Sequence, residues 1–132
     1  MSIQEWLDLL NGRVFFWLHP DRLTRLLSAR NYKNSEHDVI TLDTQSLISA
    51  YGAKVVLSPI NSGATLFPRA RPRGSGTFTK LADYPDEKWR IRADATAVAE
   101  LAVIGGVPDI ATFVVSVDRY QGPVRKSTLF KP

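Results

Sequence analysis

The chain has 132 residues, of which 44% are hydrophobic and 23% are charged, and its formal net charge is +4. This length and balance suit a single globular domain with one hydrophobic core. The chain contains no cysteine, which excludes disulfides, thiolate metal sites and a cysteine nucleophile. No apolar run approaches the roughly 20 residues that span a bilayer, and the N-terminal segment lacks the basic region of a secretory signal. We therefore expect a cytoplasmic protein with no membrane association.

The first part of the chain predicts two helices on either side of a strand. Residues 2–10 carry apolar side chains at helical spacing, and Ser2 and Glu5 have the spacing of a capping box. Residues 14–18 (VFFWL) are typical of a buried strand because they are aromatic and β-branched. Pro20 is well placed to begin the second helix, since its missing N–H is no loss at that position.

The next part predicts strand, helix and strand. A polar loop at residues 31–37 leads to a short strand, VITL, within residues 38–42. Asp43 is a good N-cap for a helix at residues 44–51, and AKVVL at residues 53–57 predicts another strand.

Residues 68–76 (PRARPRGSG) have an unusual composition. Proline and glycine prevent regular structure there, so we expect an exposed, flexible, arginine-rich loop. A further strand is predicted at residues 77–81, and residues 120–132 are expected to form a basic tail.

Residues 97–117 (AVAELAVIGGVPDIATFVVSV) predict the last two strands, with a hairpin turn expected at Gly105-Gly106. Glu100 lies in the first of these strands, where both faces are apolar around it. A buried carboxylate is costly unless it is paired or used, which makes Glu100 a candidate catalytic residue. The alternative is a glutamate on an edge strand that reaches solvent or pairs with an arginine.

This order of elements predicts an α+β fold. We expect one compact domain with N-terminal helices and an antiparallel or mixed sheet at its core.

Other candidate sites are polar turns and basic residues. His19 stands between a strand and a helix, a common place for ligand-binding side chains, although a local hydrogen bond is the commoner role. Asn61 and Ser62 lie in a polar turn that could present N–H groups to a phosphate, or could be only a turn. No spacing of histidines and carboxylates indicates a metal site.

The arginine-rich loop is a candidate nucleic-acid interface. Arg69, Arg71 and Arg73 could bind phosphates in a bidentate manner, and the nearby Tyr84 could stack on a base. A loop whose charges only keep it solvated is the alternative.

Three blocks of the chain resemble the ADP-ribosyltransferase superfamily, most nearly the DarT-type toxins that modify DNA bases. They are VFFWLHPDRLTRLL at residues 14–27, VVLSPINSGATLF at 55–67, and AELAVIGGVPDIATFVVSV at 99–117. Together they cover about a third of the chain.

This resemblance implies that NAD is the substrate, that no metal is needed and that Glu100 is the catalytic residue. The carboxylate would hold the ribose and stabilise an oxocarbenium-like state. Phe16 stands where the family keeps an NAD-contacting histidine, and His19 matches a second histidine. Asn61 replaces an arginine of the family, whereas Ser62 matches the serine beside it, and both are expected to hold NAD.

The resemblance implies an NAD-dependent ADP-ribosyltransferase or NAD glycohydrolase, such as a toxin that modifies nucleic acid. The alternative is a non-catalytic binding module on a degenerate scaffold of the same kind, because Phe16 and Asn61 stand where the NAD contacts are expected. Its partner would be a nucleic acid or a protein, for example an antitoxin. A small immunity or regulatory protein with a protein partner is the third hypothesis.

Overall fold

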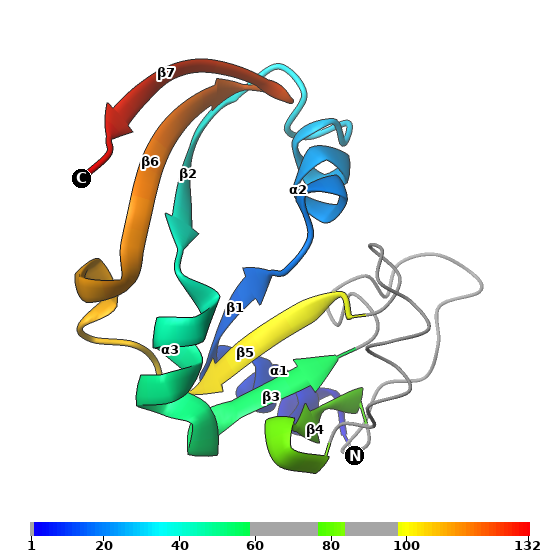
Figure 1. The fold of residues 1–132 in the computed structure, drawn as a ribbon. Helices are drawn as coiled ribbons and strands as arrows, with labels where there is room; N and C mark the ends of the chain where they lie inside the picture. The colour runs from blue at the N-terminus through cyan, green and yellow to red at the C-terminus, as the bar shows by residue number, and fades with distance from the viewer. Residues whose placement is uncertain (1, 59–76, 84–97) are drawn as a thin grey trace. The chain divides into compact units, whose positions relative to one another are not determined.

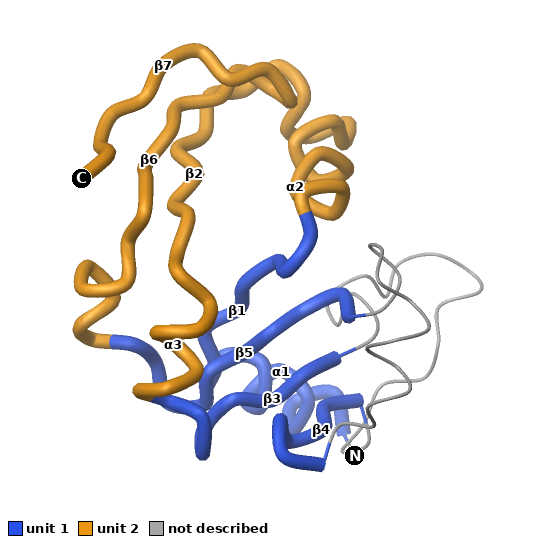
Figure 2. Tube along the Cα trace, viewed as in Figure 1, with its two compact units in different colours: residues 1–19, 51–107 blue, residues 20–50, 108–132 orange. Residues whose placement is uncertain are grey.

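The computed structural model describes residues 2–58, 77–83 and 98–132. In these residues the fold is α+β, with two antiparallel sheets and a few short helices (Figure 1). The chain divides into two compact units, each built from two segments (Figure 2). The first unit comprises Met1–His19 and Tyr51–Val107, and the second comprises Pro20–Ala50 and Pro108–Pro132. The α+β class is therefore confirmed, and each unit has its own sheet.

A four-stranded antiparallel sheet in the order β1-β5-β3-β4 forms the first unit. Its strands are β1 (Arg13–Trp17), β3 (Val55–Ser58), β4 (Thr79–Lys80) and β5 (Glu100–Ile104). All four residues of β3 and the first four residues of β5 are buried. A strand buried on both faces has a continuous apolar sequence, which is why VVL and LAV lack the alternation of a half-exposed strand.

Helix α1 (Ile3–Asn11) begins as its sequence predicted. The Glu5 N–H donates to Ser2 Oγ at 3.1 Å, and the Ser2 N–H donates to Glu5 Oε1 at 3.3 Å. The short 3-10 helices η1 (Gly52–Lys54) and η3 (Leu81–Asp83) complete the described elements of this unit.

An aromatic cluster joins α1 to the sheet. The ring of Phe78 lies 6.1 Å from that of Trp6 on α1 and 6.0 Å from that of Phe15 on β1, measured between centroids. The Arg13 guanidinium lies 5.2 Å from the centre of the Phe78 ring, close enough for a cation–π interaction. Arg13 Nη1 also donates to the Leu9 carbonyl at 2.9 Å, near the C-terminal end of α1, where cations are favourable.

The second unit contains a three-stranded antiparallel sheet in the order β2-β6-β7. Its strands are β2 (Glu36–Leu42), β6 (Val114–Gln121) and β7 (Val124–Phe130). Helix α2 (Pro20–Leu27) begins at Pro20 and α3 (Thr44–Tyr51) follows Asp43, as predicted, and the 3-10 helix η4 (Ile110–Phe113) precedes β6. The carboxylate of Asp43 accepts a hydrogen bond from the Ser46 hydroxyl.

The predicted hairpin at Gly105-Gly106 is wrong. β5 pairs with β1 and β3, whereas β6 pairs with β2 and β7, so the two strands belong to different sheets. The two glycines end β5 with φ angles of +85° and +98°, which glycine adopts readily. The Gly105 N–H donates to the Gly12 carbonyl at 2.8 Å, so this turn is joined to the end of α1.

The C-terminal residues 120–132 differ from the predicted tail. They form the end of β6 and the whole of β7, joined by the two-residue turn Gly122-Pro123. Gly122 has a φ of +53°, and glycine at the first position of a two-residue turn matches the twist of a hairpin. The Gly122 N–H donates to the Ser35 carbonyl at 2.9 Å. The segment is basic, as expected, but its backbone is ordered in a hairpin.

We expect Gly122→Ala to destabilise the protein by about 1–3 kcal/mol. A Cβ at this position would clash with the Lys33 carbonyl oxygen, and the φ angle of residue 122 is unfavourable for alanine. Gly52→Ala is the matched control, because no atom lies within 4 Å of a Cβ built there. Urea denaturation followed by circular dichroism measures both, and equal stabilities of the two variants would contradict the assigned turn.

One ion pair crosses from β2 to β6. Arg119 Nε donates to Asp38 Oδ1 at 3.0 Å and Arg119 Nη2 donates to Asp38 Oδ2 at 3.4 Å, between residues that are direct cross-strand partners. The hydrogen bond from Arg119, together with its positive charge, lowers the pKa of Asp38 below its ordinary value. The pair therefore stabilises the sheet above the ordinary pKa of an aspartate, and this contribution is lost as the pH falls through the lowered pKa.

We expect a double-mutant cycle of Asp38→Asn and Arg119→Gln to show favourable coupling at neutral pH. The coupling energy should decrease between about pH 5 and pH 2, where the Asp38 carboxylate becomes protonated. Thermal unfolding of the four proteins at each pH measures it. Coupling of the same size at both ends of this range would contradict the assigned ion pair.

Candidate active site

Glu100 is the first residue of β5, a strand with a neighbour on each side. Its side chain is buried, with an exposed fraction of 4%. The alternative of an edge-strand glutamate that reaches solvent is therefore wrong. Glu100 has an interaction partner and is not an isolated charge.

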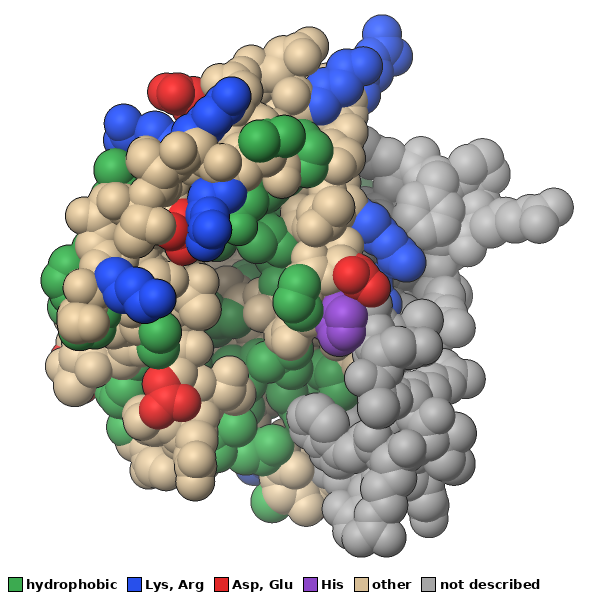
Figure 3. All heavy atoms as spheres, turned by 45° about the horizontal axis from the view of Figure 1, so that its top comes forward, with side chains coloured by type: hydrophobic (Ala, Val, Ile, Leu, Met, Phe, Trp, Pro, Cys, Tyr) green, Lys and Arg blue, Asp and Glu red, His purple; other side chains and the backbone are tan. Residues whose placement is uncertain are grey.

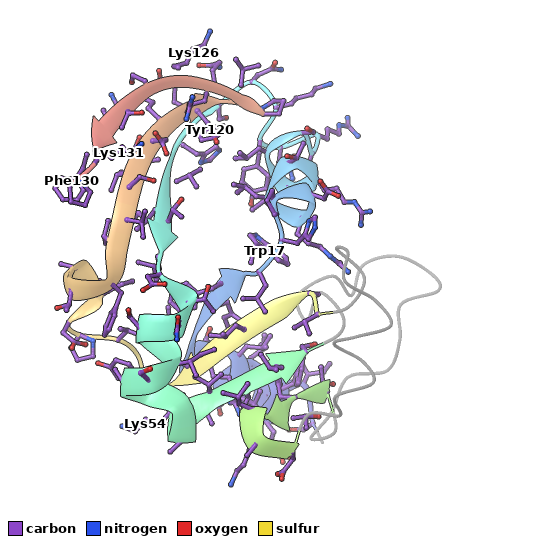
Figure 4. The ribbon with its side chains drawn as sticks, in the orientation of Figure 1. Trp17, Lys54, Tyr120, Lys126, Phe130 and Lys131 are labelled. Carbon is purple, nitrogen blue, oxygen red and sulfur yellow. The ribbon has the colours of Figure 1, made fainter. Side chains whose placement is uncertain are left out.

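The pairing of the strands places Trp17 and Ser58 directly beside Glu100. Trp17 on β1 and Ser58 on β3 are its cross-strand partners, and the Ala99 N–H donates to the Ser58 carbonyl at 2.9 Å. Cross-strand partners in an antiparallel sheet point to the same face, with Cβ atoms about 4.5–5.5 Å apart. Trp17, Glu100 and Ser58 thus form one row across the sheet. Figure 4 shows Trp17 at the C-terminal end of β1.

The rest of this face is apolar and aromatic. The next row consists of Phe15, Ala102 and Val56, and Arg13 pairs with Ile104 beyond it. Because Phe15 and Arg13 contact Phe78, the Trp6–Phe78–Phe15 cluster lies on the same face as Glu100. The carboxylate therefore stands at one end of a face that is mainly hydrophobic and aromatic, with Ser58 beside it and with Arg13 and Lys80 as its described cations.

The structure does not bring Phe16 together with Glu100. Phe16 pairs with Leu101, which also pairs with Leu57 on β3, so these residues point to the opposite face. Leu101 and Leu57 have exposed fractions of 1% and 0%. Phe16 is half-buried and belongs to this hydrophobic side of the sheet.

His19 follows β1 by two residues and is half-buried, with interactions of its own. It lies in the same unit as Glu100. The other predicted site residues, Asn61, Ser62, Arg69, Arg71, Arg73 and Tyr84, lie outside the described residues. Their roles stay predictions.

Trp17 and Ser58 were not expected from the sequence as neighbours of Glu100. A signal for each was present, because Trp17 ends an aromatic strand and Ser58 is a polar residue directly after the apolar run VVL. Their common row depends on the register of three strands, which the sequence pattern does not give.

This row combines three chemical properties. A buried carboxylate interacts strongly with positive charge because the local dielectric constant is low. The Ser58 hydroxyl, with an exposed fraction of 0%, can donate or accept a hydrogen bond. Trp17 provides an indole ring, whose face attracts cations. Among residues 2–58, 77–83 and 98–132 no group of three metal-ligating side chains occurs, and no helix there is long and apolar enough to cross a membrane.

The sequence model of a family of unknown function, DUF7002, matches residues 1–114. The chain belongs to this family. The matched residues include the whole first unit, with Glu100, Trp17 and Ser58, and end at the first residue of β6. No curated protein and no solved structure matches the chain.

We expect Leu101→Ala to reduce the free energy of unfolding by about 2–5 kcal/mol, because it leaves a cavity under the strand that carries Glu100. Leu7→Ala is the matched control in the same unit, and should cost less than about 1 kcal/mol since Leu7 is 46% exposed. Urea denaturation measures both. A small effect at Leu101 would show that β5 is not part of the core.

Proposed function

We propose that this chain is an NAD-dependent ADP-ribosyltransferase or an NAD glycohydrolase with Glu100 as its catalytic residue. The observation that supports this most is the burial of Glu100, which is 4% exposed at the start of a central strand. A carboxylate in this position is costly for folding, and such positions are often kept for chemistry.

The reaction begins with cleavage of the bond between nicotinamide and ribose. The electron pair of the bond leaves with nicotinamide, which becomes neutral, and the ribose becomes oxocarbenium-like. The Glu100 carboxylate holds a ribose hydroxyl and stabilises the positive charge that develops on the sugar. An acceptor then attacks the sugar carbon and loses a proton. If the acceptor is water the reaction is hydrolysis of NAD, and if it is a nucleic acid the reaction is ADP-ribosylation.

The neighbours of Glu100 are suited to this chemistry. Trp17 provides an aromatic surface for the cationic nicotinamide ring, and Ser58 provides a hydroxyl for a polar group of the substrate. The proposal also keeps His19, Asn61 and Ser62 as residues that hold NAD. In it the arginines of residues 69–73 and Tyr84 bind the acceptor.

One observation favours the alternative, a non-catalytic module that binds nucleic acid or a protein partner. Phe16 stands where the resemblance expects an NAD-contacting histidine, and it points to the face opposite Glu100. A protein without that contact would keep the fold but would no longer bind NAD.

We expect Glu100→Gln to lower the rate of nicotinamide release from NAD by about 100-fold or more, because one preorganised charged group is lost at the reacting sugar. Nicotinamide is measured by liquid chromatography, with circular dichroism to verify folding. Glu36→Gln is the matched control, since Glu36 is exposed on β2.

Equal rates for folded wild type and Glu100→Gln would contradict the assignment of Glu100. The alternative makes a different prediction. If the chain is a binding module, wild-type protein releases no nicotinamide and NAD does not raise its melting temperature.

A further inference from the structure

β7 is an edge strand with unusual exposure. It pairs with β6, and the described residues place no strand on its other side. All seven of its residues are exposed, including Val124 at 56% and Phe130 at 49%. An exposed edge of this length presents backbone groups and side chains to a partner.

All charged side chains on β7 and after it are positive. From Arg119 to the end of the chain there is no aspartate or glutamate. Arg125, Lys126 and Lys131 form no ion pair with any residue in the part of the chain that the structure describes, in contrast to Arg119, which is paired with Asp38. Figure 4 shows Lys126 and Phe130 on β7 and Lys131 directly after it, and Lys and Arg side chains project from the surface in Figure 3.

We propose that β7 binds single-stranded nucleic acid. Arg125, Lys126 and Lys131 contact phosphates, and the exposed ring of Phe130 stacks on a base, since cations combined with exposed aromatic rings are the common means of binding single strands. That the bound nucleic acid is the acceptor of ADP-ribose rests on the proposed function, whereas its binding to β7 does not.

The length of the strand fits this partner. Arg125 on β7 and Lys131 directly after this strand are six residues apart, which is at most about 20 Å of extended chain. A stacked nucleic-acid strand rises about 3.4 Å per nucleotide, so the two cations span about six nucleotides. Phe130 is adjacent to Lys131, so an aromatic ring and a positive charge lie together at the C-terminal end of β7.

A second copy of the chain fits this edge less well. Antiparallel pairing of two β7 strands would bring together the three cations of each copy with no carboxylate between them. Like charges across paired strands are destabilising, and lysines on edge strands prevent such pairing. A polyanion, in contrast, brings a charge of opposite sign to this edge.

The test measures binding of a fluorescent single-stranded DNA of about 12 nucleotides by anisotropy over a range of salt concentrations. The variant combines Arg125→Gln, Lys126→Gln and Lys131→Gln. The matched control combines Arg30→Gln, Lys54→Gln and Lys80→Gln, which removes the same residue types from exposed positions elsewhere. We expect the affinity of the β7 variant to fall at least about tenfold. The slope of log K against log salt should become shallower by about two, since each of the three lost phosphate contacts contributes about 0.7 to its magnitude. The control should keep the slope.

Phe130→Ala provides a second, independent readout. Loss of stacking should weaken binding by about fivefold or more and leave the salt slope unchanged, because no charge is removed. Leu129→Ala, at an exposed apolar neighbour, is the matched control and should bind as wild type does.

Three results would overturn the proposal. The first is that the wild-type protein does not bind the DNA, and the second is that the two triple variants lose affinity equally. The third is that poly-glutamate displaces the labelled DNA as well as unlabelled DNA does when the two competitors are compared at equal charge concentration. Nicotinamide release without acceptor should be unchanged in the β7 variant. If wild type and Glu100→Gln release nicotinamide equally but the protein still binds DNA, the proposed reaction is contradicted and the proposed binding by β7 is not.

Discussion

The burial of the Glu100 carboxylate is the constraint on which the first unit depends. A charge in the interior must be compensated by its surroundings, because desolvation costs several kcal/mol for an ion of this kind. Glu100 is the first residue of a central strand and is almost fully buried, with an exposed fraction of 4%. A hydrophobic residue at this place would avoid that cost, so the carboxylate must be held by its neighbours.

The register of the sheet determines what surrounds this carboxylate. β5 is held by β1 on one side and β3 on the other, so Trp17 and Ser58 are fixed as its neighbours. A slip of one residue would move Glu100 to the face that contains Leu101, and would bring that leucine to the aromatic face. At the other end of β5 the hydrogen bond from Gly105 to Gly12 fixes the end of the strand. The register is therefore specified at both ends.

The second unit contains a buried carboxylate with a simpler role. Asp118 on β6 is 8% exposed, and it accepts hydrogen bonds from Thr128 Oγ1 at 2.7 Å and Ser116 Oγ at 3.3 Å. Two hydroxyls from the same sheet satisfy it and join β6 to β7, as expected for a structural polar group. The row of Glu100 is different in kind, because it includes an indole ring and begins where β5 begins. The hairpin that Asp118 helps to hold together carries the exposed cations of β7.

The sequence by itself determined the helices, because their signals are local. The capping box of Ser2 and Glu5, Pro20 and Asp43 each act within one turn of the backbone, and each helix begins where they indicate. The sequence placed Glu100 in an apolar strand but left open whether its side chain reaches solvent, and the structure shows that it is buried. Only the tertiary structure decided that β5 and β6 belong to different sheets, that residues 124–130 form a strand, and that Trp17 and Ser58 flank Glu100. These features depend on hydrogen bonds between strands far apart in the chain, and hydrophobic periodicity within a segment does not specify its partner or its register.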